Sequence, residues 1–217
     1  LDSLQGSEES LESLKEKEEQ AYEKLTALAT TLTEKRIIAK DELAKKVEEQ
    51  IHGLGMPHAR FFIQCQPLNQ VSANGFEDIE YMIASNPGQP AQPLRKVASG
   101  GELSRISLAI QVIIGANVST PTLIFDEVDV GIGGGTAEVV GNLLHQLAVQ
   151  RQVICVTHQP QVASCGDNHL IASKTKLADS TSTRVVQLDK NQRVEEVARM
   201  LGGLKISDKT RSHAKEM

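Results

Sequence analysis

The chain has 217 residues, enough to bury a core in one domain and to carry an extension as well. Its net charge of −5 argues against a module that binds nucleic acid by overall basic charge, so a DNA contact would need a local patch or another part of an assembly. No window holds 18 apolar residues in a row, which excludes a transmembrane helix by sequence. The three cysteines are an odd number at irregular spacing, and we expect reduced thiols in a cytoplasmic protein.

Residues 1–54 are predicted to form one helix of a coiled coil, ended by Gly53, Gly55 and Pro57. The register shifts after Lys40, which indicates a stutter. More than 50 residues at a rise of 1.5 Å span roughly 75 Å, longer than a domain is wide, although a helix packed on its own domain is the alternative. The chain opens at Leu1 within this pattern, as a fragment or a processed chain would, and the partner helix is expected elsewhere. The heptad positions are occupied by Leu4, Leu11, Leu25, Leu32 and Ala39, and by Leu14, Ala21 and Leu28.

Residues 55–217 are predicted to form an α/β lobe. An apolar strand at 122–125, a helix at 136–149 and a second apolar strand at 153–157 form a βαβ unit, which predicts two buried parallel strands. The other predicted elements are strands at 58–68 and 79–84, a helix at 102–115, a hairpin of strands at 169–174 and 183–188, and a helix at 194–201.

The run Ser99, Gly100, Gly101 and Glu102 stands at the predicted start of a helix. Its spacing is that of a capping box, in which the Ser and Glu side chains satisfy backbone N–H groups of the first turn. The two glycines also leave the backbone N–H groups bare, and a bare helix N-terminus binds anions. The run therefore predicts a structural cap and, independently, a candidate phosphate site.

The strand at 122–125 is followed by Asp126 and Glu127. Ligands bind at the carboxyl end of parallel strands, so Asp126 would suit Mg²⁺ and Glu127 could polarise an attacking water. The alternative is an acidic strand end that is only solvated, and the upstream glycine motif makes that alternative weaker. His158, at the end of the next strand, could bind a phosphate or could be a histidine satisfied in a turn.

Two other nucleotide or metal motifs are disfavoured. The glycines at 131–135 end in Thr136 where a dinucleotide-binding turn has its third Gly, and the acidic residues just before them would repel a pyrophosphate. Cys155 and His158 lack a second pair at zinc spacing. The P-loop pattern Gly-x-x-x-x-Gly-Lys-Ser/Thr does not occur in these 217 residues, so the chain lacks a phosphate cradle of its own.

Together these motifs resemble the C-terminal half of an ABC-type ATPase head of the SMC kind, preceded by a returning coiled-coil arm. Within that class, residues 96–105, 124–132, 156–163 and 198–203 are similar to the RecN family of bacterial DNA repair proteins almost residue for residue. The resemblance covers residues 55–217, whereas the coil matches only in kind. Gly133 stands where general SMC heads have the D-loop aspartate, which leaves that contact across the dimer in doubt.

The resemblance implies a P-loop ATPase that uses ATP and Mg²⁺ in double-strand break repair and recombination. An N-terminal Walker A lobe of the same polypeptide would complete the head through an antiparallel coiled coil, and a second copy would complete the ATP sites of a homodimer that acts on DNA at the nucleoid. Asp126 would support Mg²⁺, while Glu127 would activate water and His158 would sense the γ-phosphate. The residues expected to bind nucleotide are Ser99, Gly100, Gly101, Glu102 and Asp129.

The resemblance also implies that this chain alone does not hydrolyse ATP. The competing hypothesis is a non-enzymatic coiled-coil tethering module whose nucleotide site is vestigial. A transporter-type nucleotide-binding subunit is a third possibility, which the 54-residue coil disfavours because transporter ATPases have no such arm.

Overall fold

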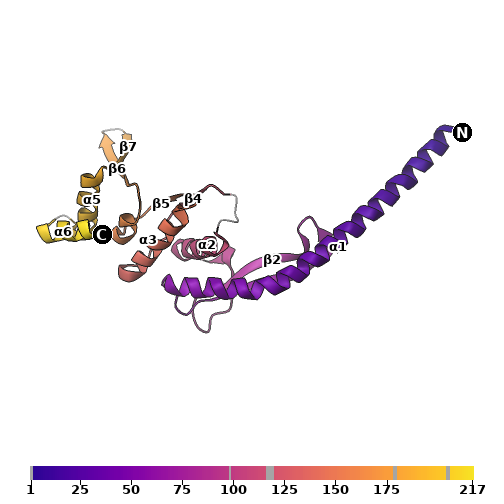
Figure 1. Ribbon diagram of the computed structural model, residues 1–217, viewed down its shortest axis with the longest axis horizontal. Helices are drawn as coiled ribbons and strands as arrows, with labels where there is room; N and C mark the ends of the chain where they lie inside the picture. The colour runs from indigo at the N-terminus through magenta and orange to yellow at the C-terminus, as the bar shows by residue number, and fades with distance from the viewer. Residues whose placement is uncertain (1, 98, 116–119, 178–179, 204–205) are drawn as a thin grey trace. The chain divides into compact units, whose positions relative to one another are not determined.

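The computed structural model describes residues 2–97, 99–115, 120–177, 180–203 and 206–217 (Figure 1). Ala98, within the predicted signature segment, lies outside these residues, and the side chain of Leu4 lies outside the described side chains. The chain divides into two compact units, one of Leu1–Lys46 and Arg60–Arg95 and the other of Val47–Ala59 and Lys96–Met217. The division into an arm of residues 1–54 and a lobe of residues 55–217 stays a prediction.

Helix α1 runs from Asp2 to Gly53 without a break, so the predicted long helix is confirmed over these residues. Its heptad side chains Leu11, Leu14 and Leu28 are 57%, 59% and 70% exposed. Leucines repeated at heptad positions and left in water are typical of a coiled-coil helix seen without its partner. The pairing itself stays a prediction.

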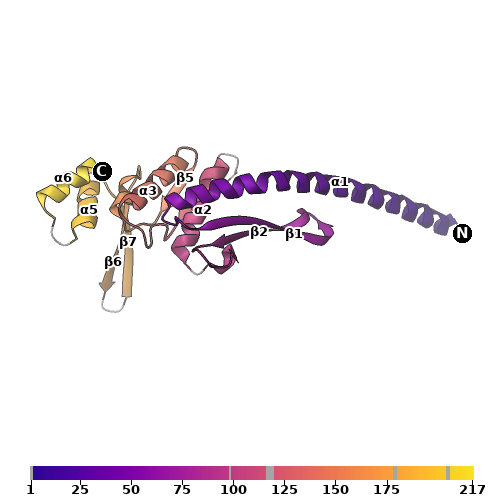
Figure 2. The same cartoon turned by 90° about the horizontal axis from the view of Figure 1, so that it is seen from below.

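A long hairpin packs beside α1 in the first unit (Figure 2). Strands β1 (Arg60–Ser72) and β2 (Gly75–Ala84) are antiparallel, and the short β3 (Gln92–Pro93) pairs with β2 before the 3₁₀ turn Leu94–Lys96. Both long strands extend beyond the predicted ranges. At the tip of the hairpin the Ser72 hydroxyl accepts from Asn74 N at 3.1 Å, and Gly75 has a φ of +99°. This turn lets the two strands pair beyond the residues that the hydrophobic pattern marks.

The hairpin is joined to α1 through Glu77. The Thr33 hydroxyl and the Arg36 guanidinium both donate to this carboxylate, the second at 2.9 Å. A Cβ on Gly75 would lie 3.1 Å from Arg36 Nη1 and 3.2 Å from Leu32 Cδ2, so the turn approaches the helix closely. Ala29, one turn along α1, is buried.

The second unit contains the βαβ motif. Helix α2 (Gly100–Ile114) precedes β4 (Thr122–Phe125), α3 (Gly134–Ala148) and β5 (Gln152–Cys155). Strands β4 and β5 are parallel, with Phe125 opposite Cys155, which confirms the predicted unit. The end of α1, from Val47 on, also belongs to this unit, where Val47, Ile51 and, just after the helix, Leu54 are fully buried.

One face of this sheet is not buried as predicted. Phe125 is 5% exposed, whereas its neighbour Ile124 is 70% exposed, and Ile154 and Val156 on β5 and just after it are also exposed. Helix α3 packs on β5, and successive strand side chains point to opposite faces, so one face is covered and the other is left open. The expectation of strands buried on both faces is therefore wrong for the residues that the structure describes.

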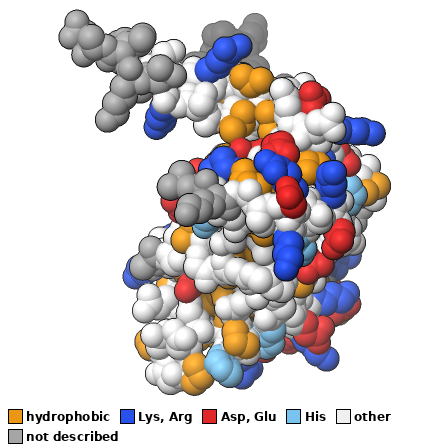
Figure 3. Space-filling model, turned by 90° about the vertical axis from the view of Figure 1, so that its left-hand side faces the viewer, with side chains coloured by type: hydrophobic (Ala, Val, Ile, Leu, Met, Phe, Trp, Pro, Cys, Tyr) orange, Lys and Arg blue, Asp and Glu red, His pale blue; other side chains and the backbone are white. Residues whose placement is uncertain are grey.

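The C-terminal part adds a hairpin and three helices. A small core of Val197, Ala198 and Ala214 joins the last two helices. The side of the molecule drawn in Figure 3 shows acidic, basic and apolar side chains interspersed. The described surface on that side therefore carries no broad basic patch. None of the described helices is both long and apolar enough to cross a membrane. The elements are α4 (Pro160–Ser164), β6 (Leu170–Leu177), β7 (Ser180–Gln187), α5 (Lys190–Gly202) and α6 (Asp208–Glu216).

Candidate nucleotide site

The N-terminus of α2 has the Ser99 half of the predicted capping box, followed by the two glycines. Ser99 Oγ accepts from Glu102 N at 3.3 Å. A Cβ on Gly100 would overlap Glu127 Oε2, and one on Gly101 would lie 3.1 Å from the carbonyl oxygens of Glu127 and Val130. The close approach requires glycine at Gly101, where a Cβ would meet backbone atoms of the loop after β4, whereas at Gly100 it would meet only the movable end of the Glu127 side chain.

Asp126 and Glu127 form a sharp turn at the end of β4. Asp126 Oδ1 accepts from Glu127 N at 2.9 Å, and the Ser104 hydroxyl of α2 donates to the Asp126 carbonyl at 2.6 Å. Glu127 has a φ of +59°, in the left-handed region that few non-glycine residues adopt. The chain therefore leaves the strand at Glu127, whose exposed side chain lies against Gly100 rather than on the opposite face of the sheet.

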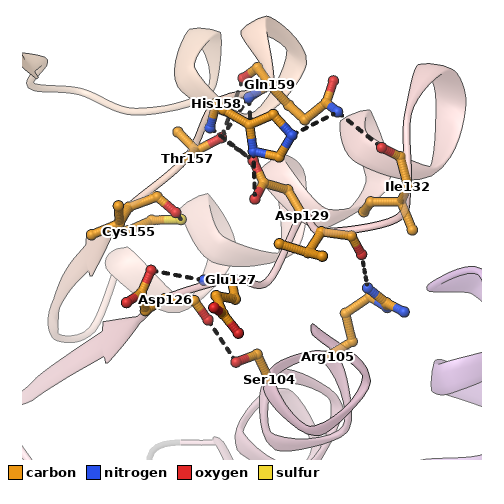
Figure 4. A network of polar contacts seen from close by, with 12 residues as sticks. Ser104, Arg105, Asp126, Glu127, Asp129, Ile132, Cys155, Thr157, His158 and Gln159 are labelled. Atoms are coloured by element: carbon orange, nitrogen blue, oxygen red, sulfur yellow. Dashed lines mark hydrogen bonds and ion pairs between the residues drawn. The ribbon is translucent and has the colours of Figure 1, made fainter. Parts of the chain in front are cut away.

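Asp129 is the buried centre of the loop between β4 and α3, at 1% exposure. Its Oδ2 accepts from the Thr157 hydroxyl, from His158 N at 3.1 Å and from Gln159 N at 3.2 Å. Its Oδ1 lies 3.4 Å from His158 Nδ1 (Figure 4). These contacts join the loop after β4 to the loop after β5, so two of the predicted site segments are brought together.

Arg105 connects the same loop to α2. Its side chain is buried, and Nη1 donates to the Val130 carbonyl at 2.7 Å. Burial lowers the pKa of Arg105, an effect that the nearby Glu102 carboxylate opposes. Among the described residues, Arg105 Nε has no hydrogen-bond partner.

The structure thus places Gly100 against Glu127 and His158 against Asp129, and Figure 4 shows Glu127, Asp129 and His158 in one view of the second unit. Sequence reasoning did not assign roles to four residues that hold this region together. Ser104 and Arg105 follow shortly after the two glycines in the predicted helix. This position is the only feature of the sequence that points to them. The residues without an assigned role are Ser104, Arg105, Thr157 and Gln159.

The donor groups fit a phosphate ligand better than a free metal ion. The bare start of α2 suits an anion. Asp126 offers a carboxylate oxygen of the kind Mg²⁺ takes, but no group of three or more His, Cys, Asp or Glu side chains that could hold a metal occurs among the described residues. A magnesium ion here would need phosphate oxygens, water or another lobe to complete its ligands. Burial, Asp129 and Asp126 together raise the pKa of the Cys155 thiol to about 12, so it stays protonated and is a poor ligand.

The fold is that of an SMC-type head. The chain resembles the Smc head domain with a coiled coil and joint from Pyrococcus yayanosii, with a TM-score of 0.57 and 19% identity over 90% of this chain and 35% of that one. It also resembles the Smc head domain with an extended coiled coil from Pyrococcus furiosus, with a TM-score of 0.54 and 18% identity over 91% and 47% of the two chains. The chain therefore has the α/β fold of a lobe of an SMC-type head with an N-terminal helical arm, which confirms the predicted fold class.

The sequence relatives are more specific, although no family model matches the chain. It is 46% identical to the DNA repair protein RecN of Vibrio cholerae over 215 residues, 99% of this chain and 39% of the relative. The RecN protein of Haemophilus influenzae is 47% identical over 210 residues, 96% and 38% of the two chains. That of Bacillus subtilis is 32% identical over 233 residues, 100% and 40%. The chain belongs to the RecN family, and it spans about two fifths of the length of these relatives.

Proposed function

We propose that the chain supplies one half of a shared ATPase site in an SMC-like protein of DNA double-strand break repair and recombination. The observation that carries the proposal is the meeting of a bare helix start, Gly100 and Gly101, with the strand-end carboxylate of Glu127. One lobe thereby presents both phosphate-binding donors and a candidate base for water, and two copies would bring the donors of one head to the base of the other. The RecN relatives are named DNA repair proteins, which supplies the cellular role.

The missing half is an N-terminal Walker A lobe of the same polypeptide. The relatives are more than twice as long as this chain, and the chain has no P-loop pattern. The exposed sheet face at Ile124, Ile154 and Val156 supports a covering lobe, because parallel sheets are normally covered on both faces. The exposed heptad leucines of α1 support a returning helix that pairs with it in an antiparallel coil.

Two heads then share two ATP molecules. ATP supplies the anhydride bond to be cleaved, and Mg²⁺ neutralises charge on its phosphates. Ser99, Gly100, Gly101 and Glu102 of one head bind the γ-phosphate held by the other head, with the backbone N–H groups as donors. ATP would join the heads and hydrolysis would release them, and the arm would transmit that change to DNA at the nucleoid in the cytoplasm.

The residues after the strands act on the nucleotide of their own head. Asp126 holds Mg²⁺ through its carboxylate. Glu127 orients and deprotonates the attacking water, and His158 contacts the γ-phosphate. The turn at Glu127 and the exposure of His158 support these roles, since both side chains are accessible to a ligand.

The test uses the complete polypeptide with Glu127→Gln, which keeps the side-chain volume and removes the base. We expect this variant to bind ATP without turnover and to accumulate ATP-dependent dimers, measured by size-exclusion chromatography with light scattering. An ATP-bound variant that stays in the nucleotide-free oligomeric state would overturn head dimerisation. The 217-residue chain by itself should show negligible hydrolysis, and robust hydrolysis by it would overturn the shared site.

A further inference from the structure

The Asp129 carboxylate makes different contacts through its two oxygens. Oδ2 accepts hydrogen bonds from three donors, the Thr157 hydroxyl and the backbone N–H groups of His158 and Gln159. Oδ1 is left to face His158 Nδ1 at 3.4 Å. The carboxylate is almost fully buried, whereas 66% of the His158 side chain is exposed. One edge of the imidazole is therefore anchored to the protein and the other faces outward.

The outward nitrogen contacts the Gln159 side chain. Gln159 Nε2 donates to the Ile132 carbonyl at 2.9 Å, and a carbonyl oxygen can only accept, so this contact fixes which end of the amide is nitrogen. The same nitrogen lies 3.4 Å from His158 Nε2. An amide nitrogen can only donate, so His158 Nε2 has to be the acceptor.

We propose that Asp129 is a positioning residue that, together with Gln159, holds His158 as the neutral tautomer with the proton on Nδ1. A proton on Nδ1 points at Asp129 Oδ1, and the lone pair on Nε2 receives the Gln159 amide, so both contacts favour the same tautomer. Nε2 is then the one ring nitrogen that a ligand can reach. This task differs from the direct nucleotide contact that the sequence predicts for Asp129.

The functional meaning of this arrangement rests on the proposed ATPase site. A phosphate oxygen that replaces the Gln159 amide needs a proton on Nε2, taken from solvent, and Asp129 Oδ1 then faces an imidazolium whose charge it balances. The neighbouring Val130 carbonyl is held by Arg105 of α2. A movement of the start of α2 would therefore change the position of His158, because Arg105 holds Val130 and the neighbouring Asp129 holds His158.

The direct test needs no nucleotide. In the complete polypeptide labelled with ¹⁵N at histidine, the His158 signals are assigned by their loss in His158→Gln. In the neutral imidazole we expect a protonated Nδ1 and an unprotonated Nε2. A proton on Nε2, or an equal mixture of the two tautomers, would overturn the proposal whether or not the protein hydrolyses ATP.

Two variants separate this role from a general effect on folding. Asp129→Asn and Gln159→Met each remove one of the two contacts, and each is expected to shift His158 toward the Nε2–H tautomer. The matched control is Asp167→Asn, which removes an exposed carboxylate 3.8 Å from His145 and should leave His158 unchanged. If Asp129→Asn does not fold, Gln159→Met alone decides, and an unchanged tautomer in the folded variants contradicts the proposal.

The proposal also predicts how turnover changes. In the complete polypeptide we expect Gln159→Met to lower kcat for ATP hydrolysis about tenfold with KM little changed, because it disturbs the ring that meets the γ-phosphate. If the wild-type protein has no ATPase activity, the proposed function fails while the tautomer measurement still stands. If the wild type is active and its His158 carries the proton on Nε2, this inference fails alone.

Discussion

Each unit of the molecule contains a carboxylate bound by a threonine hydroxyl, and the two are held in different ways. Glu77 accepts from Thr33 and pairs with the Arg36 guanidinium, so side chains alone join the hairpin to α1. Asp129 accepts from Thr157 and from two backbone N–H groups, and no Arg or Lys of the described part of the chain pairs with it. The first contact fixes the packing of two elements, whereas the second fixes the path of a loop beside the candidate site.

This difference sets an order of energetic cost. A backbone N–H group that loses a buried acceptor cannot reorient toward water, so the folded state is destabilised by the full desolvation cost of an unsatisfied donor. Side-chain donors near the surface can rotate into water, and ion pairs there contribute little. Substitutions around Asp129 should therefore cost more than substitutions around Glu77.

The largest expected effect is that of Asp129→Ala. It removes the acceptor of one hydroxyl and two N–H groups, and we expect the opening free energy of the loop at residues 157–159 to fall by about 3 kcal/mol. Hydrogen exchange of the complete polypeptide, read by mass spectrometry on peptides that cover these residues, measures it. Asp167→Asn is the control, and equal protection in Asp129→Ala and wild type would contradict the central role of this carboxylate.

The two glycines of α2 test the same loop from the helix side. A Cβ on Gly101 meets the carbonyl oxygens of Glu127 and Val130, which are fixed in the backbone, so Gly101→Ala should destabilise the second unit by about 2 kcal/mol. A Cβ on Gly100 meets only the flexible end of Glu127, so Gly100→Ala should keep near-wild-type stability and lose hydrolysis. Thermal unfolding and ATPase rates of both variants check this pair, and the opposite pattern would show that the close approach is not as described.

A smaller effect is expected in the first unit. Glu77→Gln keeps an acceptor for Thr33 and removes the charge that Arg36 pairs with, so the hairpin should exchange its amide hydrogens only slightly faster than in wild type. Hydrogen exchange of peptides covering β1 and β2 measures this. Thr33→Val is the companion variant, and a loss as large as that of Asp129→Ala would remove the distinction between the two contacts.

The smallest effect concerns pH. The Thr33 hydroxyl first, and the Arg36 guanidinium after it, lower the pKa of Glu77 below its ordinary value, although desolvation opposes them. A carboxylate with a lowered pKa in the folded state stabilises that state above the pKa of the unfolded chain, and the stabilisation is lost as pH falls through the folded value. The hairpin should therefore loosen at acid pH, and Glu77→Gln should flatten this dependence in melting curves recorded from neutral to acid pH.

Local patterns predicted most of the elements but not their three-dimensional contacts. The arm, the βαβ unit and α2 follow from heptads, apolar runs and the Ser99 cap. Helix α4 has only five residues, and α6 is polar with Ala214 as its one buried residue, so neither shows a helical hydrophobic pattern.

The site was predicted in its parts and not in its connections. Ser99, Asp126 and His158 stand out in the sequence because each stands just before or just after a predicted element. The partners of Asp129 come from a loop 28 to 30 residues further along the chain, and nothing local marks such a pairing. The left-handed turn at Glu127 also has no local signal in the sequence, because Glu127 packs against Gly100 and Gly101 at the start of α2.

The most direct test of the shared site mixes two inactive complete polypeptides, one with Ser99→Arg and the other with Glu127→Gln. If each ATP lies between the Glu127 side of one head and the Ser99 side of the other, a mixed dimer has one intact site. An equal mixture should then recover about a quarter of the wild-type ATPase rate, since half the dimers are mixed and each has one of its two sites intact. A mixture as inactive as its components, although mixed dimers form, would contradict the account.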